Sequence, residues 1–179
     1  MAQGASASHL RPVLIGLVGR SRVGKDTVAS FFSDTHTVTR LAKPIKEACK
    51  AIYGWDDAVL ETDLKEVLDP RLGVSPRLAM IHMTQAIRAF TDPEFFTRRL
   101  FDSWDGTTPM VIPDVRYDHD VREIHKRGGV TIKVTRPGCP RHVAEDTVDD
   151  LWTTYEVQND GAIEELRVKV ASLVFIGTK

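Results

Sequence analysis

Residues 19–27, GRSRVGKDT, follow an apolar run at residues 13–18. The run is short and continuous, which predicts a buried strand, and apolar residues recur at helical spacing directly after the stretch. A strand, a glycine-flanked loop and a helix in this order are the setting that a phosphate-binding P-loop requires. The alternative, a glycine-rich turn ahead of an ordinary helix, is disfavoured because strand, loop and helix all agree.

The residue types in this P-loop suit the binding of phosphate. Two glycines let the backbone curl so that successive N–H groups point inward, and the helix that follows adds partial positive charge. Lys25 would bring a full positive charge to the outer phosphates. The residues of the loop expected to bind the nucleotide are Gly19, Ser21, Val23, Gly24, Lys25, Asp26 and Thr27.

The loop departs from the consensus G-x-x-x-x-G-K-[ST] at one position. Asp26 follows the lysine, and the hydroxyl arrives one residue later as Thr27. A G-K-x-T ending resembles the nucleoside monophosphate kinase branch of P-loop proteins. Thr27 is expected to hold Mg²⁺, and whether Asp26 assists it is left open.

Length and charge narrow the class of protein. The 179 residues fit one domain, and 24 Lys and Arg against 25 Asp and Glu leave a net charge of -1. No global charge attracts nucleic acid or an anionic membrane, and no apolar run is long enough to span one. Residues 1–11 are expected to form a disordered arm and not a signal peptide. Two cysteines without metal-ligand spacing are typical of a reducing cytoplasm.

Four further short apolar or β-branched runs predict strands at residues 36–42, 109–114, 130–134 and 155–158. Five strands separated by helices indicate an α/β fold, a three-layer sandwich in which a parallel sheet has helices on both faces. Residues 55–105 are expected to form a helical excursion between two strands. Within the helices, Ile52 and Ile163 are expected to face inward, and Pro93 is expected in the first turn of a helix.

The strand at residues 109–114 ends on Asp114. An aspartate at the end of an apolar strand beside the P-loop strand is the Walker B arrangement, which holds Mg²⁺. The alternative is an N-cap for the helix that follows, and the metal role is favoured because a P-loop needs a magnesium partner. Arg116 would then face the same phosphates.

Two basic regions are candidates for contacts with phosphate. Residues 136–150 are predicted to form a mobile lid whose Arg136 and Arg141 close over the phosphates, with a merely charged surface loop as the alternative. Lys43 follows the second strand, and ligands of open α/β sheets bind at the carboxyl ends of strands. A phosphate role for Lys43 and a solvated lysine are both open.

A small kinase is the function that remains after other classes are excluded. The GTPase motif N-K-x-D is absent from the sequence, and Asp114 is followed by Val-Arg-Tyr instead of a D-x-x-G switch. A motor ATPase would have a longer chain and a basic track. A phosphate acceptor has a second pKa of about 6 and is anionic at neutral pH, so it needs positive charge and no catalytic base.

The chain resembles the phage deoxynucleoside monophosphate kinase family in four segments, GRSRVGKDTVASFF, LAKPIKEA, IPDVRY with the following GG, and NDG. The set GKD, PxKE, DPxFF and D-x-R is also similar to animal phosphomevalonate kinase. The resemblance implies ATP as donor with Mg²⁺, an acceptor phosphate held by Arg88 with Lys43 on the acceptor side, and an ATP base beside Asn159 and Asp160. Arg77 and Arg116 are further candidates for binding the acceptor.

These observations lead to the expectation of a P-loop kinase with a five-stranded parallel sheet, a helical acceptor-binding region at residues 43–105 and a short lid. The expected partners are small-molecule nucleotides, without nucleic acid or membrane, for a cytoplasmic monomer or homodimer, in the host cytoplasm if the protein is viral. Two alternatives to a deoxynucleoside monophosphate kinase stay open, a phosphomevalonate-type kinase and a catalytically silent nucleotide-binding module.

Overall fold

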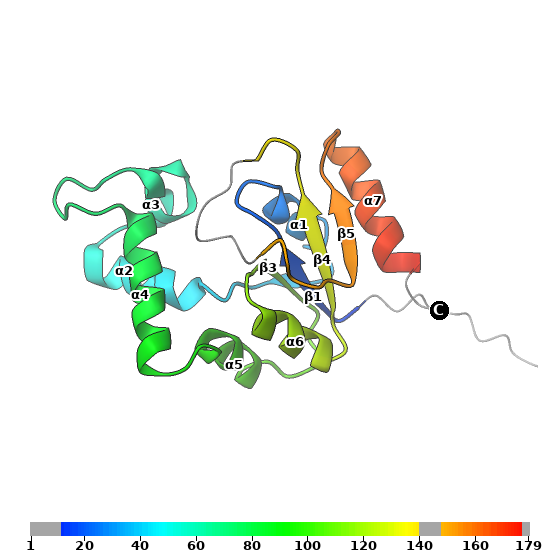
Figure 1. The fold of residues 1–179 in the computed structure, drawn as a ribbon, viewed down its shortest axis with the longest axis horizontal. Coiled ribbons are helices and arrows are strands. Elements are labelled where there is room, and N and C mark those ends of the chain that lie inside the picture. The colour runs from blue at the N-terminus through cyan, green and yellow to red at the C-terminus, as the bar shows by residue number, and fades with distance from the viewer. Residues whose placement is uncertain (1–11, 140–147, 177–179) are drawn as a thin grey trace, which may run out of the picture. The chain divides into compact units, whose positions relative to one another are not determined.

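The computed structural model describes residues 12–139 and 148–176 (Figure 1). Within them the chain divides into two compact units. One unit contains the residues up to Thr39 and those from Trp104 onward, and it carries the sheet. The other unit, Arg40–Ser103, is helical. Among the described residues, no helix combines the length and apolar character that crossing a membrane requires.

The described part of the first unit contains a parallel sheet of five strands in the order β2-β3-β1-β4-β5. The strands are β1 (Leu14–Val18), β2 (Thr37–Val38), β3 (Met110–Val115), β4 (Val130–Thr135) and β5 (Tyr155–Gln158). The predicted parallel sheet is confirmed, with the P-loop strand β1 at its centre. The predicted strand at 36–42 was too long, because β2 is an exposed edge strand whose two residues pair with β3 before the chain leaves the sheet.

Helices cover both faces of this sheet, as predicted. They are α1 (Lys25–Ser30), α6 (Asp118–Lys126) and α7 (Ile163–Ile176). Successive side chains of β1 point to opposite faces, so Ile15 and Leu17 share a core with residues of α1 and α7. Gly16 faces α6, and a Cβ there would lie 2.5 Å from the side chain of Ile124. In Figure 1, α7 runs beside β5.

The helical unit packs around its longest helix. Its elements are α2 (Lys43–Tyr53), α3 (Asp57–Glu61), the 3₁₀ helix η1 (Asp63–Glu66), α4 (Pro76–Phe90) and α5 (Phe95–Asp102). Helix α4 contacts α2, α3 and η1. The Ser75 hydroxyl caps α4 by accepting a hydrogen bond from the Leu78 N–H at 3.3 Å. Gly54 ends α2 in the left-handed conformation, with φ of 71°, which glycine adopts readily.

Three details of the predicted helices were wrong. Ile52 is 63% exposed and Ile163 is 55% exposed, because each lies in the terminal turn of its helix, α2 or α7. Pro93 lies outside α5, which begins at Phe95. The Asp92 carboxylate accepts a hydrogen bond from the Glu94 N–H at 2.8 Å, so a turn centred on Pro93 precedes the helix.

Candidate active site

The P-loop between β1 and α1 requires glycine at two positions. Gly19 has φ of 150° and Gly24 has φ of 105°, both in the range that side chains disfavour. A Cβ on Gly19 would lie 2.4 Å from the carbonyl oxygen of Val134, and a Cβ on Gly24 would lie 2.5 Å from the side-chain nitrogen of Asn159. The loop therefore lies directly against the ends of β4 and β5.

Lys25 is the first residue of α1, and its side chain folds back across the P-loop. The ammonium group donates a hydrogen bond to the carbonyl oxygen of Gly19 at 2.7 Å and another to that of Arg20. The positive charge therefore lies beside the backbone that the sequence predicts to bind phosphates. Of the other predicted residues, Ser21 is half-buried in the loop, Asp26 is exposed and Thr27 is half-buried on α1.

Arg22 and Val23, in the middle of the P-loop, make further contacts that fix its conformation. Arg22 has φ of 63°, and a left-handed conformation costs a residue with a side chain about 1–2 kcal/mol. Its carbonyl oxygen accepts a hydrogen bond from the Cys139 thiol at 3.7 Å. The Val23 side chain is buried in the core beneath the loop. Such strain is retained where the surrounding structure fixes the conformation, and it is common at functional sites.

Asp114 lies in β3, immediately beside the P-loop strand. Gly16 pairs with Ile112 and Val18 pairs with Val115, so two steps along β1 match three along β3. The extra residue of this irregularity lies in the segment that holds Asp114, and bulges of this kind change the direction of a side chain. The N-cap alternative for Asp114 is wrong, because α6 begins at Asp118 with Tyr117 as its N-cap.

Asp120 is a buried carboxylate that the sequence analysis missed. Its Oδ2 accepts hydrogen bonds from the backbone N–H groups of Arg116 at 3.1 Å and Tyr117 at 3.0 Å. Its side chain is 1% exposed, and His119 lies 3.3 Å from its other oxygen. These bonds fix the backbone of the half-buried Arg116 directly after β3. An acidic residue three positions after an N-cap is the sequence signal that indicates such a cap.

The described part of the predicted lid lies next to the P-loop. Arg136 is exposed, and together with Gly19, Arg20 and Asp149 it lines a hollow of about 190 Å³. The guanidinium of Arg20 forms an ion pair with the Asp149 carboxylate, a contact that no local pattern indicates because the two residues are far apart in sequence. Arg141 and most of the predicted lid lie outside the described residues.

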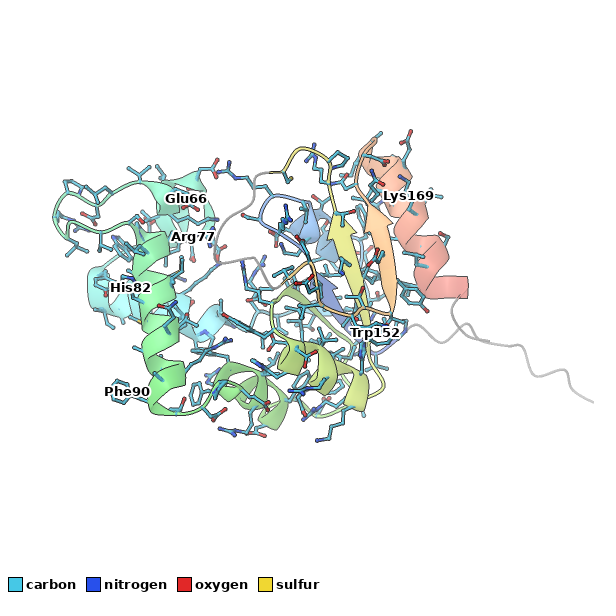
Figure 2. The ribbon with its side chains drawn as sticks, in the orientation of Figure 1. Glu66, Arg77, His82, Phe90, Trp152 and Lys169 are labelled. Atoms are coloured by element: carbon cyan, nitrogen blue, oxygen red, sulfur yellow. The ribbon has the colours of Figure 1, made fainter. Side chains whose placement is uncertain are left out.

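The two residues after β5 lie in different surroundings. The Asn159 side chain donates a hydrogen bond to the carbonyl oxygen of Val23 at 2.8 Å, which brings it against the P-loop. Lys169 lies on α7 (Figure 2). Asp160 forms an ion pair with it at 2.6 Å, and the hydrogen bond from Lys169 lowers the pKa of the Asp160 carboxyl. The predicted contact of both residues with the ATP base stays a prediction.

The residues predicted to bind the acceptor phosphate belong to the helical unit. Lys43 is exposed at the first position of α2. Arg77 forms an ion pair with Glu66 at 3.0 Å on the same unit (Figure 2). The Arg88 guanidinium lies over the Phe96 ring, 5.8 Å from its centroid, and so links α4 to α5. Their role in binding an acceptor stays a prediction.

The predicted magnesium ligands are suited to that ion. Mg²⁺ is bound by oxygen ligands, usually one or two from the protein, with substrate phosphates and water completing the coordination. Thr27 offers a hydroxyl and Asp114 a carboxylate, and α1 and β3 pack against each other. In the described ranges no group of three or more His, Cys, Asp or Glu side chains could form an all-protein metal site. The donor set therefore fits a metal shared with bound phosphates.

The fold and the P-loop together define the class of this protein. A parallel α/β sheet whose central strand leads into a G-x-x-x-x-G-K loop is typical of P-loop nucleotide-binding proteins. No protein-family model matches the chain. It is 30% identical over 186 residues to a protein of Acanthamoeba polyphaga mimivirus provisionally named a deoxynucleotide monophosphate kinase. The match covers 90% of this chain and 96% of the viral protein.

This chain belongs to the deoxynucleotide monophosphate kinase family. It is therefore a phosphotransferase of the P-loop class. Two solved structures are also similar, the Thermus thermophilus protein TT1252 (19% identity, TM-score 0.49) and shikimate kinase from Aquifex aeolicus (13% identity, TM-score 0.47). The first match covers 95% of this chain and 100% of the other, and the second covers 89% and 95%.

Proposed function

We propose that this protein is a deoxynucleoside monophosphate kinase, which transfers the γ-phosphoryl group of ATP to the phosphate of a deoxynucleoside monophosphate. The products are ADP and a deoxynucleoside diphosphate. The observation that carries the proposal is the glycine-dependent P-loop with Lys25 folded across it. Its support is the 30% identity to the mimivirus protein, which extends over nearly the full length of both chains.

The proposed reaction joins two anions and depends on positive charge. An oxygen of the acceptor phosphate forms a bond to the γ-phosphorus, the bond from that phosphorus to the β–γ bridging oxygen breaks, and ADP leaves with the electron pair. The acceptor has a second pKa of about 6, so it is already anionic at neutral pH and needs no catalytic base. Lys25, Arg116 and Arg136 are proposed to supply the charge, with Arg141 from the lid.

Magnesium is proposed as the cofactor of the donor nucleotide. When bound, Mg²⁺ neutralises charge on the β- and γ-phosphates. Thr27 would hold it through the hydroxyl and Asp114 through the carboxylate, and Asp26 is a further oxygen donor beside Thr27. The position of Asp114 in β3, next to the strand that leads into the P-loop, supports this assignment.

The helical unit is proposed to bind the acceptor. Arg88 is the main candidate, because a guanidinium binds a phosphate through two parallel hydrogen bonds. The Arg88 guanidinium lies over the Phe96 ring, 5.8 Å from its centroid, and this contact helps to hold the cation on the helical unit. Arg77 and Lys43 are the additional cations proposed for the same acceptor.

A coupled assay that measures ADP release tests the proposal. The protein with ATP and Mg²⁺ is given each of the four deoxynucleoside monophosphates, then phosphomevalonate, then no acceptor. We expect release with at least one deoxynucleoside monophosphate and only background release with phosphomevalonate. Release with phosphomevalonate alone would identify the alternative kinase. A protein that binds ATP but releases no ADP with any acceptor would be a catalytically silent module.

A further inference from the structure

Asn159 connects the end of the sheet to the P-loop. Its backbone N–H donates to the carbonyl oxygen of Thr135 at 2.7 Å, which extends the pairing of β4 with β5 by one residue. Its side-chain nitrogen donates to the carbonyl oxygen of Val23 at 2.8 Å. Because a carbonyl oxygen only accepts hydrogen bonds, the NH₂ half of the side-chain amide must face Val23. The backbone of Asn159 is thus fixed by the sheet, and its side chain reaches the loop.

This contact sets the direction of one peptide plane. The peptide between Val23 and Gly24 is trans and planar, so its carbonyl and its N–H point in opposite directions. When Asn159 holds the Val23 oxygen, the Gly24 N–H is turned away from Asn159. Gly24 has φ of 105°, and a Cβ at this position would lie only 2.5 Å from the side-chain nitrogen of Asn159. The loop therefore has little room to rotate this peptide while Asn159 is in place.

We propose that Asn159 is a positioning residue for phosphate binding. By holding the Val23 carbonyl it keeps the Gly24 N–H directed at the bound phosphates, as one donor of the P-loop nest. This inference rests on the proposed nucleotide-binding function, and it differs from a contact with the ATP base. The base contact would act on the nucleoside half of ATP, whereas the positioning role acts on the phosphates alone.

Inorganic tripolyphosphate separates the two roles, because it carries phosphates and no base. Isothermal calorimetry would measure the affinity of Asn159→Ala for ATP and for tripolyphosphate, both with Mg²⁺. We expect the affinity for each to fall by the same factor, about fivefold to tenfold, because one hydrogen bond that orders the loop is lost. Asn159→Asp keeps the shape of the side chain but has no donor and adds a negative charge. Its loss should exceed that of alanine for both ligands.

Gln158→Ala is the matched control, since this exposed side chain is the neighbouring residue on β5. It should bind both ligands as the unmodified protein does. The inference would be overturned if both Asn159 variants, shown to be folded by their melting temperatures, bound tripolyphosphate with unchanged affinity. If, in addition, they lost affinity for ATP, Asn159 would be assigned to the ATP base. If the unmodified protein bound neither ligand, the proposed function would fail first, and the inference with it.

Discussion

Lys25 has a structural role and a proposed catalytic role. Its ammonium group binds carbonyl oxygens at the start of the P-loop, and it is proposed to meet the phosphates that the loop holds. Both tasks depend on a long side chain with a charge at its end, so no shorter or neutral residue can perform them. The residue itself lies on the first turn of α1, where replacement by alanine favours the helix.

Lys25→Ala should therefore remove activity and leave the fold intact. We expect kcat to fall by at least about a hundredfold, as for other lost preorganised charges in active sites. The coupled ADP-release assay measures this, with Lys126→Ala as the control because Lys126 is an exposed lysine that pairs with Glu123 on α6. A variant that kept turnover within tenfold of the unmodified protein would exclude the role of Lys25.

The segment from β3 into α6 brings two aspartates to the same end of the sheet, for different reasons. Asp114 lies in the irregular part of β3, beside β1. Asp120 lies buried on the first turn of α6 and accepts hydrogen bonds from the backbone that joins the two elements. The first is proposed to bind magnesium, and the second stabilises the connection.

Asp114→Asn preserves the size of the side chain and removes its charge. If Asp114 holds magnesium, the concentration of Mg²⁺ needed for half-maximal rate should rise at least about tenfold, because a neutral amide is a weaker ligand for a hard cation. A titration of kcat against Mg²⁺ at saturating ATP gives the value. Asp118→Asn serves as the comparison, since Asp118 is exposed at the start of α6 and pairs with Arg122. Superimposable titrations for Asp114→Asn and the unmodified protein would leave Asp114 without a metal role.

Asp120→Ala should lower stability, because it removes a buried carboxylate that accepts hydrogen bonds from the backbone N–H groups of Arg116 and Tyr117. The expected loss is about 2 kcal/mol, which corresponds to a melting temperature lower by about 4 to 8 °C for a chain of this length. Thermal unfolding followed by circular dichroism measures it. Asp118→Ala removes only an exposed ion pair and should change stability by less than about 0.5 kcal/mol. Equal shifts for the two variants would contradict the cap that Asp120 provides.

The elements themselves were predictable wherever the pattern was local. The apolar run into the P-loop predicted a buried strand from neighbouring residues alone, and β1 is buried along its whole length. The predicted burial of Ile52 and Ile163 was wrong. Helical spacing indicates which face of a helix is apolar, but it does not indicate how far along the helix the neighbouring core extends. The start of α5 was misassigned because Asp92 bonds to Glu94 in a turn and not to the first turn of the helix.

Contacts between distant segments could not be predicted in the same way. Asn159 and Val23 are 136 residues apart in sequence, and only the strand order β1-β4-β5 brings them together. The same holds for Arg20 and Asp149. The resemblance to known kinases pointed to Asn159 as a nucleotide residue, but the bond to the P-loop depends on the register of β4 and β5. The residue types of the site could therefore be predicted from the sequence, whereas the atoms that they contact could be identified only from the fold.

At the level of the whole chain, the sheet unit carries the proposed donor site and the helical unit, Arg40–Ser103, carries the proposed acceptor residues. The bounds of this unit lie close to the region at 43–105 that was predicted to bind the acceptor. This division suggests that substitutions in the two units should affect different substrates.

Arg88→Lys tests that division, because lysine keeps the charge and loses the bidentate geometry. We expect KM for the monophosphate to rise about tenfold or more while KM for ATP changes little, as one charge-assisted hydrogen bond is worth about 1.5–3 kcal/mol. Steady-state kinetics with each substrate varied in turn gives both values. Arg99→Lys, on the exposed side of α5, should change neither. A similar rise in both KM values would instead indicate that Arg88 has a structural role.

The P-loop of this protein is proposed to direct a phosphoryl group from ATP to the phosphate of a deoxynucleoside monophosphate. The most direct measurement follows the label from ATP labelled with ³²P at the γ-position, in the presence of Mg²⁺ and each deoxynucleoside monophosphate, by chromatography of the products. We expect label in a deoxynucleoside diphosphate with the unmodified protein, and at least about a hundredfold slower labelling with Lys25→Ala. Label found only in inorganic phosphate, or transferred equally well by Lys25→Ala, would contradict the proposal.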